Sequence, residues 1–343
     1  MNRDDIEDFI RQMPKIDLHR HLSGAVRSRA MFELAKKRGI EVEGGDFDSF
    51  KKLTSLHEDE RGFHTFLHKF KSRARFYTDP ALIGEVTRAV IRDCAEENIR
   101  YLELRFSASH FSRHMGFDME RTTEQIISTA IAESQSAHLD VSFLMTLTRE
   151  LPLEENEELL RIALSSGLSS YFAGIDIAGD EETVLLEPFK PLIARAVDHG
   201  KKVTIHAGEA GPAGNVREAM NAGASRIGHG VACFGHESIL QESIERGITF
   251  EVCPTSNVHT GTIKEVADLD LKRLLDEGVA VTVNTDDPGI SETTLTHELF
   301  SVQQVFSLSK QYLKKLLLNA VEGAFISAEQ KTKLRRHIDA YFS

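Results

Sequence analysis

Residues 202–209 read KVTIHAGE, a short apolar run that ends directly in a histidine and a glutamate. Three other segments repeat this arrangement of polar side chains after an apolar run: DLHRH at 17–21, GHG at 228–230 and TDDP at 285–288. In a parallel barrel all strands end at one face, so clusters that are far apart in sequence meet there. The pattern predicts a parallel barrel with a polar site at the carboxyl ends of its strands.

Eight β-like runs alternate with segments of helical periodicity along the whole chain. Several runs are apolar on both faces, as is typical of parallel strands covered by helices. The expected strands are 16–19, 101–106, 141–147, 172–177, 202–205, 225–228, 248–252 and 279–283. This order predicts an α/β fold, a (β/α)8 TIM-type barrel. An open doubly wound sheet is the alternative, but no G-x-G-x-x-G turn follows the first strand.

The interval between the first two expected strands is unusually long, which predicts extra helices inserted after strand 1 at 28–98. An apolar stripe recurs there at near-helical spacing: Phe63, Phe66, Leu67 and Phe70. The stripe either packs on the barrel or forms a lid over its mouth, because insertions after strands lie on the catalytic face. No Pro/Ser-rich linker interrupts the chain, so we expect a single domain over residues 1–343.

The composition is that of an ordinary globular chain with a strongly acidic balance. Its 343 residues are 41% hydrophobic and carry a formal net charge of −12. Nucleic acids and anionic membranes select basic surfaces, so we expect neither as a partner and favour a neutral small molecule. The start of the chain has four acidic residues and no signal-peptide pattern, and no segment is apolar for long enough to span a membrane. We therefore expect a cytoplasmic protein, and no protein partner can be inferred.

The histidines have the spacing of metal ligands. His19 and His21 lie two apart on an expected strand, so their side chains point to the same side. His206 is followed by Glu209, which suits metal-activated water, with one group holding the metal and the other moving protons. Each cluster alone has an ordinary alternative, such as hydrogen-bonded histidines or an acid near a helix N-terminus. Their shared position at one face of the barrel favours a metal site.

Carboxylates supply the remaining candidates. Asp286 and Asp287 are adjacent, and such a pair raises each other's pKa unless a cation or donor is present; a turn or helix cap is the alternative. His229, between two glycines, is a candidate ligand, base or core residue. Three histidines and a carboxylate suit one Zn²⁺. The segment 175–179 has no lysine or glutamate that would bridge two metals, which favours a mononuclear site.

Taken together, these motifs resemble the adenosine deaminase family of the amidohydrolase superfamily over essentially the whole chain. The resemblance is carried by the H-x-H at His19, AGDE at 178–181, HAGEAG at 206–211, RIGHGV at 226–231, CPTSN at 253–257 and NTDDP at 284–288. It implies a zinc-dependent enzyme that hydrolytically deaminates adenosine at C6 to give inosine and ammonia.

The resemblance also implies a role for each site residue. The ligands of one Zn²⁺ would be His19, His21, His206 and Asp286. Glu209 would give a proton to purine N1, His229 would hold the attacking hydroxide, and Asp286 would accept its hydrogen bond. The substrate would contact His21, Ser23, Gly179 through its N–H to N3, and Asp287 at N7. The apolar segment with Phe66, Leu67 and Phe70 matches the family's lid.

Ser23 departs from the family pattern, in which an acid at this place helps to hold the ribose 5′-hydroxyl. Serine is shorter and uncharged, so it would tolerate a 5′-substituent. The substrate is then either adenosine, with Ser23 binding the hydroxyl directly or through water, or a 5′-modified adenosine such as methylthioadenosine or aminodeoxyfutalosine. We favour adenosine. Phosphorylated nucleotides are less expected because no glycine-rich loop follows strands seven and eight, although Arg20 and Arg27 lie close in sequence.

Two other functions fit parts of the pattern. A barrel metallohydrolase could cut an amide or phosphoester, but the Gly-Glu context of Glu209 favours protonation of a ring nitrogen. A catalytically inactive nucleoside-binding relative would have lost a ligand or the acid, and this chain retains all of them. The remaining histidines are expected to face solvent, among them His57, His64, His110 and His138.

Overall fold

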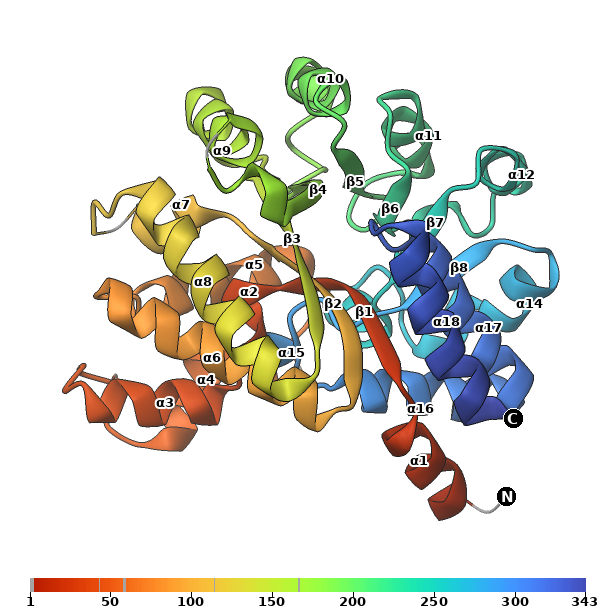
Figure 1. Ribbon diagram of the computed structural model, residues 1–343, viewed down its shortest axis with the longest axis horizontal. Coiled ribbons are helices and arrows are strands. Elements are labelled where there is room, and N and C mark those ends of the chain that lie inside the picture. Colours follow the sequence, from red (N-terminus) through yellow and green to blue (C-terminus); the bar gives the residue numbers. More distant parts are fainter. Residues whose placement is uncertain (1–2, 43, 58–59, 114, 166) are drawn as a thin grey trace.

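The computed structural model describes residues 3–42, 44–57, 60–113, 115–165 and 167–343. Eight parallel strands in this part of the chain pair in sequence order, each with the next (Figure 1). Their bounds are β1 (Lys15–His21), β2 (Ile99–Phe106), β3 (Asp140–Thr148), β4 (Phe172–Ala178), β5 (Lys202–Ala207), β6 (Arg226–His229), β7 (Thr249–Val252) and β8 (Ala280–Val283). The (β/α)8 prediction is confirmed, and each expected strand overlaps an observed one.

Backbone pairing between Arg20 and Asp286 closes the barrel. A parallel bridge joins these two residues across the gap between the last strand and the first. The backbone N–H of His21 donates to the carbonyl of Asp286 at 2.9 Å, and the N–H of Asp286 donates to the carbonyl of His19 at 2.8 Å. The closure of the barrel therefore fixes the backbone of three predicted site residues.

Helices surround the strands because the outward-facing side chains of the barrel are apolar and must be covered. Those following β2 to β7 are α7 (Ala108–Ser112), α8 (Met119–Ala137), α9 (Leu153–Ser165), α10 (Lys190–Asp198), α11 (Ala213–Asn221), α12 (Glu237–Glu245), α13 (Pro254–His259) and α14 (Leu271–Asp276). After β8 come α15 (Pro288–Ser291), α16 (Leu295–Phe306), α17 (Lys310–Gly323) and α18 (Ala328–Phe342), and α1 (Arg3–Gln12) precedes β1. None of the helices in the described segments is both long and apolar enough to cross a membrane.

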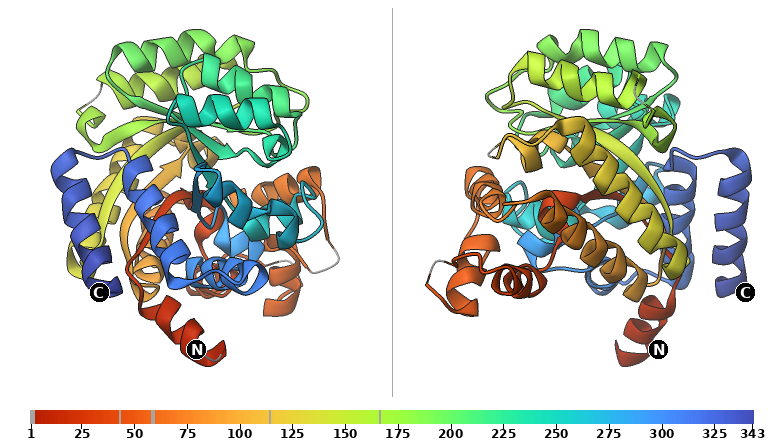
Figure 2. Two further views of the ribbon diagram at one scale, coloured as in Figure 1. Left: turned by 90° about the vertical axis from the view of Figure 1, so that its right-hand side faces the viewer. Right: turned by 60° about the vertical axis from the view of Figure 1, so that its left-hand side comes forward.

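The extra helices predicted after strand 1 are present. They are α2 (Leu22–Ala25), α3 (Ser28–Lys37), α4 (Phe47–Thr54) and α5 (Phe63–Ala74), followed by α6 (Pro80–Glu96), which packs on the barrel. Figure 2 shows the inserted helices, in red to orange, together on one side of the barrel and away from the blue C-terminal helices.

A buried arginine fixes the end of α5 to the barrel mouth. Arg73 donates to the backbone carbonyls of Thr54 and Val26, each at 2.8 Å, and of Gly289 at 2.7 Å. One guanidinium thus joins three separate segments of the chain. Its several N–H donors point in different directions and can reach three carbonyls at once. Phe66, earlier on α5, packs in a small cluster with Leu56 and Ile290, apart from the main core.

Candidate active site

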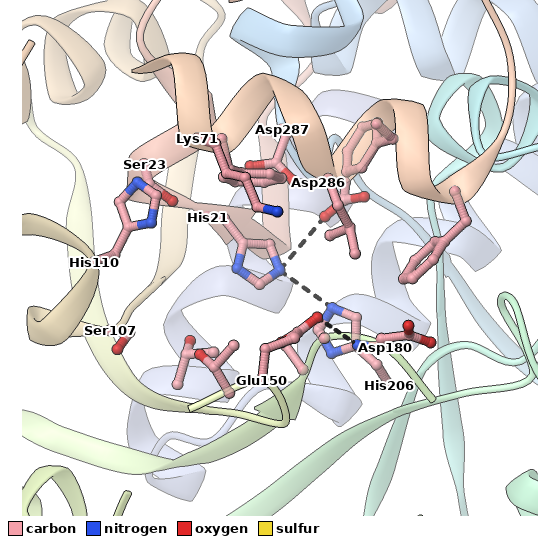
Figure 3. A pocket seen from close by; sticks show the side chains of 18 of the residues that line it. His21, Ser23, Lys71, Ser107, His110, Glu150, Asp180, His206, Asp286 and Asp287 are labelled. Atoms are coloured by element: carbon pink, nitrogen blue, oxygen red, sulfur yellow. Dashed lines mark hydrogen bonds and ion pairs between the residues drawn. The ribbon is translucent and has the colours of Figure 1, made fainter. Parts of the chain in front are cut away.

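Side chains from four strand ends meet inside the carboxyl face of the barrel. The Nε2 atom of His19 lies 3.3 Å from Asp286 Oδ1, and Nε2 of His21 lies 3.5 Å from the same oxygen. His21 Nε2 is also 3.2 Å from His206 Nε2 (Figure 3). His229 joins them from the end of β6, because one donor atom each from His19, His206, His229 and Asp286 lies within 4.8 Å of the others. The structure therefore brings together every predicted metal ligand.

Two members of this cluster have left-handed backbone conformations. Both His229 and Asp286 have φ of 62°, a region that residues other than glycine seldom adopt. Such a conformation costs on the order of 1–3 kcal/mol and persists where the surrounding structure holds it. At Asp286 the barrel-closing backbone hydrogen bonds do so. Both residues with this strained backbone belong to the cluster.

Three of the inward histidines are each oriented by a buried partner on Nδ1. His19 Nδ1 lies 2.7 Å from Glu251 Oε2, and His206 Nδ1 lies 3.0 Å from Asp176 Oδ1. Asn257 Nδ2 is 3.0 Å from Nδ1 of His229. A carboxylate on Nδ1 fixes the ring and leaves Nε2 facing inward with a lone pair, which is the arrangement of metal-bound histidines.

The cluster fits a zinc ion. Nε2 of His19 and Nε2 of His229 are buried and find no hydrogen-bond partner among the described residues, although buried polar atoms are normally paired. Imidazole nitrogens with one carboxylate are the donor set that Zn²⁺ prefers. Geometry alone admits either His21 or His229 as the fourth ligand beside His19, His206 and Asp286.

The charge state of the cluster suits a cation. Burial by itself would raise the pKa of Asp286, but the ring of His19, whose Nε2 lies 3.3 Å from Oδ1, and the neighbouring histidines lower that pKa well below its ordinary value. Ser256 Oγ donates to the other carboxylate oxygen at 2.7 Å. Asp286 is therefore an ionised acceptor in the middle of the nitrogen donors.

The loop that carries Glu209 is held by one buried carboxylate. Glu181 accepts the backbone N–H groups of residues 208, 209, 210 and 211 at distances of 2.6 to 2.9 Å, and the side-chain amide of Asn215 at 2.9 Å. Five donors on two oxygens leave this loop little freedom. Glu209 Oε2 consequently lies 3.5 Å from Nε2 of His229, at the edge of the cluster.

Two other carboxyls of the site favour the protonated form. Burial, with the nearby carboxylates of Asp286 and Glu181, raises the pKa of Glu209 well above its ordinary value. Burial and the adjacent Asp286 also raise the pKa of Asp287. Gly24 makes room for Asp287, because a Cβ at residue 24 would lie 1.8 Å from its Oδ1. In both groups the raised pKa favours the protonated carboxyl, which can donate a hydrogen bond.

A cavity of about 650 Å³ opens onto this cluster. Its wall includes His21, Glu209, His229, Asp286 and Asp287 at the inner end, and Figure 3 shows His21, Asp286 and Asp287 among them. The predicted substrate residues Ser23, Gly179, Phe66, Leu67 and Phe70 all line it as well. The apolar stripe of α5 therefore packs through Phe66 against Leu56 and Ile290 and also lines the cavity.

Three expectations about charged and histidine side chains need correction or refinement. His110 does not simply face solvent, because it lines the cavity and packs against the rings of Phe70 and Tyr77. Arg20 is fully buried and binds Asp17 Oδ2 at 3.0 Å, while Arg27 is paired with Asp93 at 3.1 Å. Neither arginine lines the cavity.

The residues that sequence reasoning missed are the orienting partners Asp176, Glu251, Asn257 and Glu181. Asp176 and Glu251 carried a detectable signal, because each is an acid inside an apolar strand, where a charge requires a partner. Glu181 lies in a loop and Asn257 on the short helix α13, and their partners are distant in sequence.

Comparison with known proteins identifies the relatives of this chain. It matches the family described as adenosine deaminase over residues 14–341. An adenosine deaminase of Clostridium perfringens is 30% identical over 95% of this chain and 98% of its own length. The adenine deaminase of Arthrobacter aurescens superposes with a TM-score of 0.88 at 23% identity, covering 96% of this chain and 99% of that one. Arabidopsis ADAL complexed with IMP has a TM-score of 0.86 and 26% identity, covering 97% and 98%.

Proposed function

Because this chain belongs to the adenosine deaminase family, we propose that it hydrolytically removes the 6-amino group of a purine nucleoside. Adenosine is the first candidate substrate, with inosine and ammonia as products. The observation that carries this proposal is the convergence of inward histidine nitrogens, the Asp286 carboxylate and the Glu209 carboxyl at the inner end of one cavity. The reaction needs a metal centre that activates water, which the histidines and Asp286 would form, and an acid that protonates the ring, which Glu209 would supply.

One Zn²⁺ would be held by four residues: His19, His21, His206 and Asp286. Zinc, when bound, lowers the pKa of a water molecule to about 7, so that hydroxide is available at neutral pH. We assign His229 to the reaction instead of the metal, because its Nε2 lies beside Glu209. The hydrogen-bonding partners of His19 and His206 keep those rings oriented for ligation.

The chemical step is assigned to Glu209 and His229. Glu209, whose pKa is raised, donates its proton to purine N1, which makes C6 electrophilic enough for water to add. His229 is buried, and burial lowers its pKa, so its ring is neutral; because its Nδ1 accepts from Asn257, its Nε2 carries a proton and holds the attacking oxygen by donating a hydrogen bond. Asp286 orients the same oxygen by accepting its hydrogen bond, and the 6-amino group takes up the proton that this oxygen releases and leaves as ammonia.

Recognition of the purine is assigned to groups at the cavity wall. Protonated Asp287 donates to N7, which is only an acceptor, and the backbone N–H of Gly179 donates to N3. His21, Phe66, Leu67 and Phe70 cover the ring system and exclude bulk water, which strengthens the electrostatic interactions within.

A 5′-modified adenosine is the second candidate substrate, and Ser23 favours it. Ser23 lines the cavity with a short uncharged side chain two residues after His21. A substituent on the ribose 5′ carbon would meet no carboxylate at this residue. The related Arabidopsis protein is complexed with IMP, which carries a phosphate at that carbon.

We further propose that residues 1–343 act as one catalytic unit in the cytoplasm, with a small-molecule purine nucleoside as partner and no nucleic acid or membrane. The acidic net charge of −12 supports this assignment.

The direct test is ammonia release from adenosine by purified, zinc-loaded protein, with adenine and 5′-deoxy-5′-methylthioadenosine measured in parallel. We expect adenosine to be converted to inosine and adenine to react poorly. Absence of ammonia from every 6-aminopurine nucleoside would refute the proposal. A strong preference for methylthioadenosine would retain the reaction and change the first substrate.

A further inference from the structure

The outer end of the cavity gathers polar and basic side chains that the reaction at C6 does not use. We propose that Lys71, Ser107, His110 and Ser23 form a subsite for a phosphate on the ribose 5′ carbon. This inference rests on the proposed deaminase function and specifies its substrate class: a purine nucleoside 5′-monophosphate is deaminated more efficiently than the free nucleoside. All four residues line the same cavity as Glu209 and Asp286.

Aromatic contacts hold these residues together. The hydroxyl of Tyr77 donates to the backbone carbonyl of Ser23 at 3.3 Å, and its ring centroid lies 6.1 Å from that of His110. The His110 ring is also 5.9 Å from Phe70, the α5 residue that precedes Lys71. α2, α5 and α7 thus meet around this end of the cavity, and Figure 3 shows the Lys71 amine directed into it.

Ser107 provides a hydroxyl that has no partner in the protein. It occupies the N-cap position of α7, where serine ordinarily accepts a backbone N–H, but its side chain makes no cap hydrogen bond. The side chain is only 8% exposed, and its Oγ has no hydrogen-bond partner among the described residues. Buried hydroxyls are normally paired, so a ligand in the cavity is the missing partner.

Lys71 supplies a positive charge that no described carboxylate neutralises. The other basic residues nearby are engaged: Lys69 pairs with Glu60 at 2.8 Å, and Lys51 pairs with Glu292 at 2.6 Å. Lys71 lines the cavity and forms no ion pair within the described segments. A lysine ammonium is a compact charge suited to a phosphate oxygen.

Two of the carboxylates that line the cavity lie away from this end. Figure 3 shows Glu150 and Asp180 across the cavity from Ser23 and His110. Asp180 is occupied by Thr183, whose hydroxyl donates to it at 2.7 Å, and Glu150 accepts the N–H of Asp180 at 2.7 Å. The other charged and titratable wall residues comprise the catalytic carboxyls at the inner end and His64, His68 and Arg113 toward the opening.

This location explains why no phosphate signal was found in the sequence. The expected signal was a glycine-rich loop after strands seven and eight, where backbone N–H groups would bind the phosphate. Here the donors are side chains from other segments of the mouth, after β1 and β2 and on the inserted α5. Single residues scattered over 23–110 form no recognisable motif.

The test compares kcat/KM for adenosine 5′-monophosphate, adenosine and 5′-deoxy-5′-methylthioadenosine with the zinc-loaded wild type. We expect the monophosphate to be favoured over adenosine by about tenfold or more, the effect of one charge-assisted contact. Methylthioadenosine separates the effect of charge from that of size, because its 5′-substituent is uncharged.

Lys71→Gln and Ser107→Ala should each lower the ratio of monophosphate to adenosine turnover by about three- to tenfold. Lys52→Gln, an exposed lysine on the adjacent α4, is the matched control and should leave that ratio unchanged.

Three other results are informative. Adenosine turnover that equals or exceeds that of the monophosphate would overturn the phosphate subsite and leave the proposed function intact. Methylthioadenosine turnover above that of the monophosphate would likewise show that an uncharged group belongs there. Failure of all three compounds to release ammonia would overturn the proposed function itself.

Discussion

The two ends of the cavity are built differently. At the inner end, the histidines and Asp286 come from strand ends, and buried groups such as Glu251 and Asp176 orient the histidine rings. At the outer end, Lys71 and Ser107 come from α5 and the turn into α7, and the protein gives them no hydrogen-bond or ion-pair partner among its described residues.

This difference assigns separate tasks to the two ends. A metal site requires donor atoms whose positions are fixed to within fractions of an ångström. The strands fix the backbone of the ligands, and the hydrogen-bonding partners on Nδ1 fix the histidine rings. A substrate subsite needs groups that are unpaired until the substrate arrives, because a donor already engaged has to break one interaction to form another. Changes at the inner end should therefore abolish chemistry, whereas changes at the outer end should alter which substrate is used.

The largest effect is expected at Glu209. Glu209→Gln removes the acidic proton while keeping the size of the side chain, so kcat should fall by about 10²- to 10⁴-fold. Zinc content, measured by metal analysis, should be unchanged because Glu209 is assigned no metal contact. Glu245→Gln on exposed α12 is the control. Activity near that of the wild type would contradict the assigned role.

Asp176 tests whether the inner end depends on its orienting partners. Asp176→Asn weakens the interaction with His206 Nδ1, and zinc affinity should fall by about 10- to 100-fold. Competition with a chelator of known affinity measures this change, and Asp198→Asn on the surface of α10 serves as the comparison. Unchanged zinc affinity would mean that His206 does not bind the metal through Nε2.

Glu181 tests the loop that carries the acid. In Glu181→Gln, an amide N–H₂ replaces one oxygen and meets backbone donors, so the 208–211 loop loses part of its support. We expect kcat to fall by about tenfold, equivalent to roughly 1.4 kcal/mol, with zinc content retained. Glu182→Gln, its exposed neighbour, should behave as the wild type. Equal kinetics in both variants would remove Glu181 from the positioning of Glu209.

The smallest effect is expected from the apolar cover. Leu67→Ala removes part of the α5 surface facing the cavity, and KM should rise by about three- to tenfold from the loss of apolar contact. The value of kcat should change less than twofold, because the inner end is untouched. Leu153→Ala on α9, remote from the cavity, is the control. A large fall in kcat with constant KM would place α5 in the chemical step.

The fold could be predicted from sequence because its signals are local and repeated. Each strand is an apolar run of the right length, and eight alternations with helical patterns leave few architectures. The site residues were also accessible, because a barrel brings all strand ends together. His19 and Asp286 could thus be placed near each other without knowing any contact.

The orienting and outer residues could not be predicted, for a different physical reason. Glu181 acts through hydrogen bonds to a loop 27 to 30 residues away, and no local pattern encodes that pairing. His110 was expected to face solvent. This expectation failed because the direction of the turn after β2 is set by packing against Tyr77 and Phe70. Side chains that are placed by contacts with the helices inserted after β1 are the hardest to predict from the sequence.

The most direct test of the central claim is a zinc titration of metal-free protein with deaminase activity measured at each point. The cluster of three histidines and Asp286 predicts that ammonia release from the best 6-aminopurine substrate rises linearly and saturates at one Zn²⁺ per chain. The His19→Ala variant, which removes a ligand, should neither bind this ion nor gain activity. Full turnover by metal-free protein, or saturation at a different stoichiometry, would contradict the account.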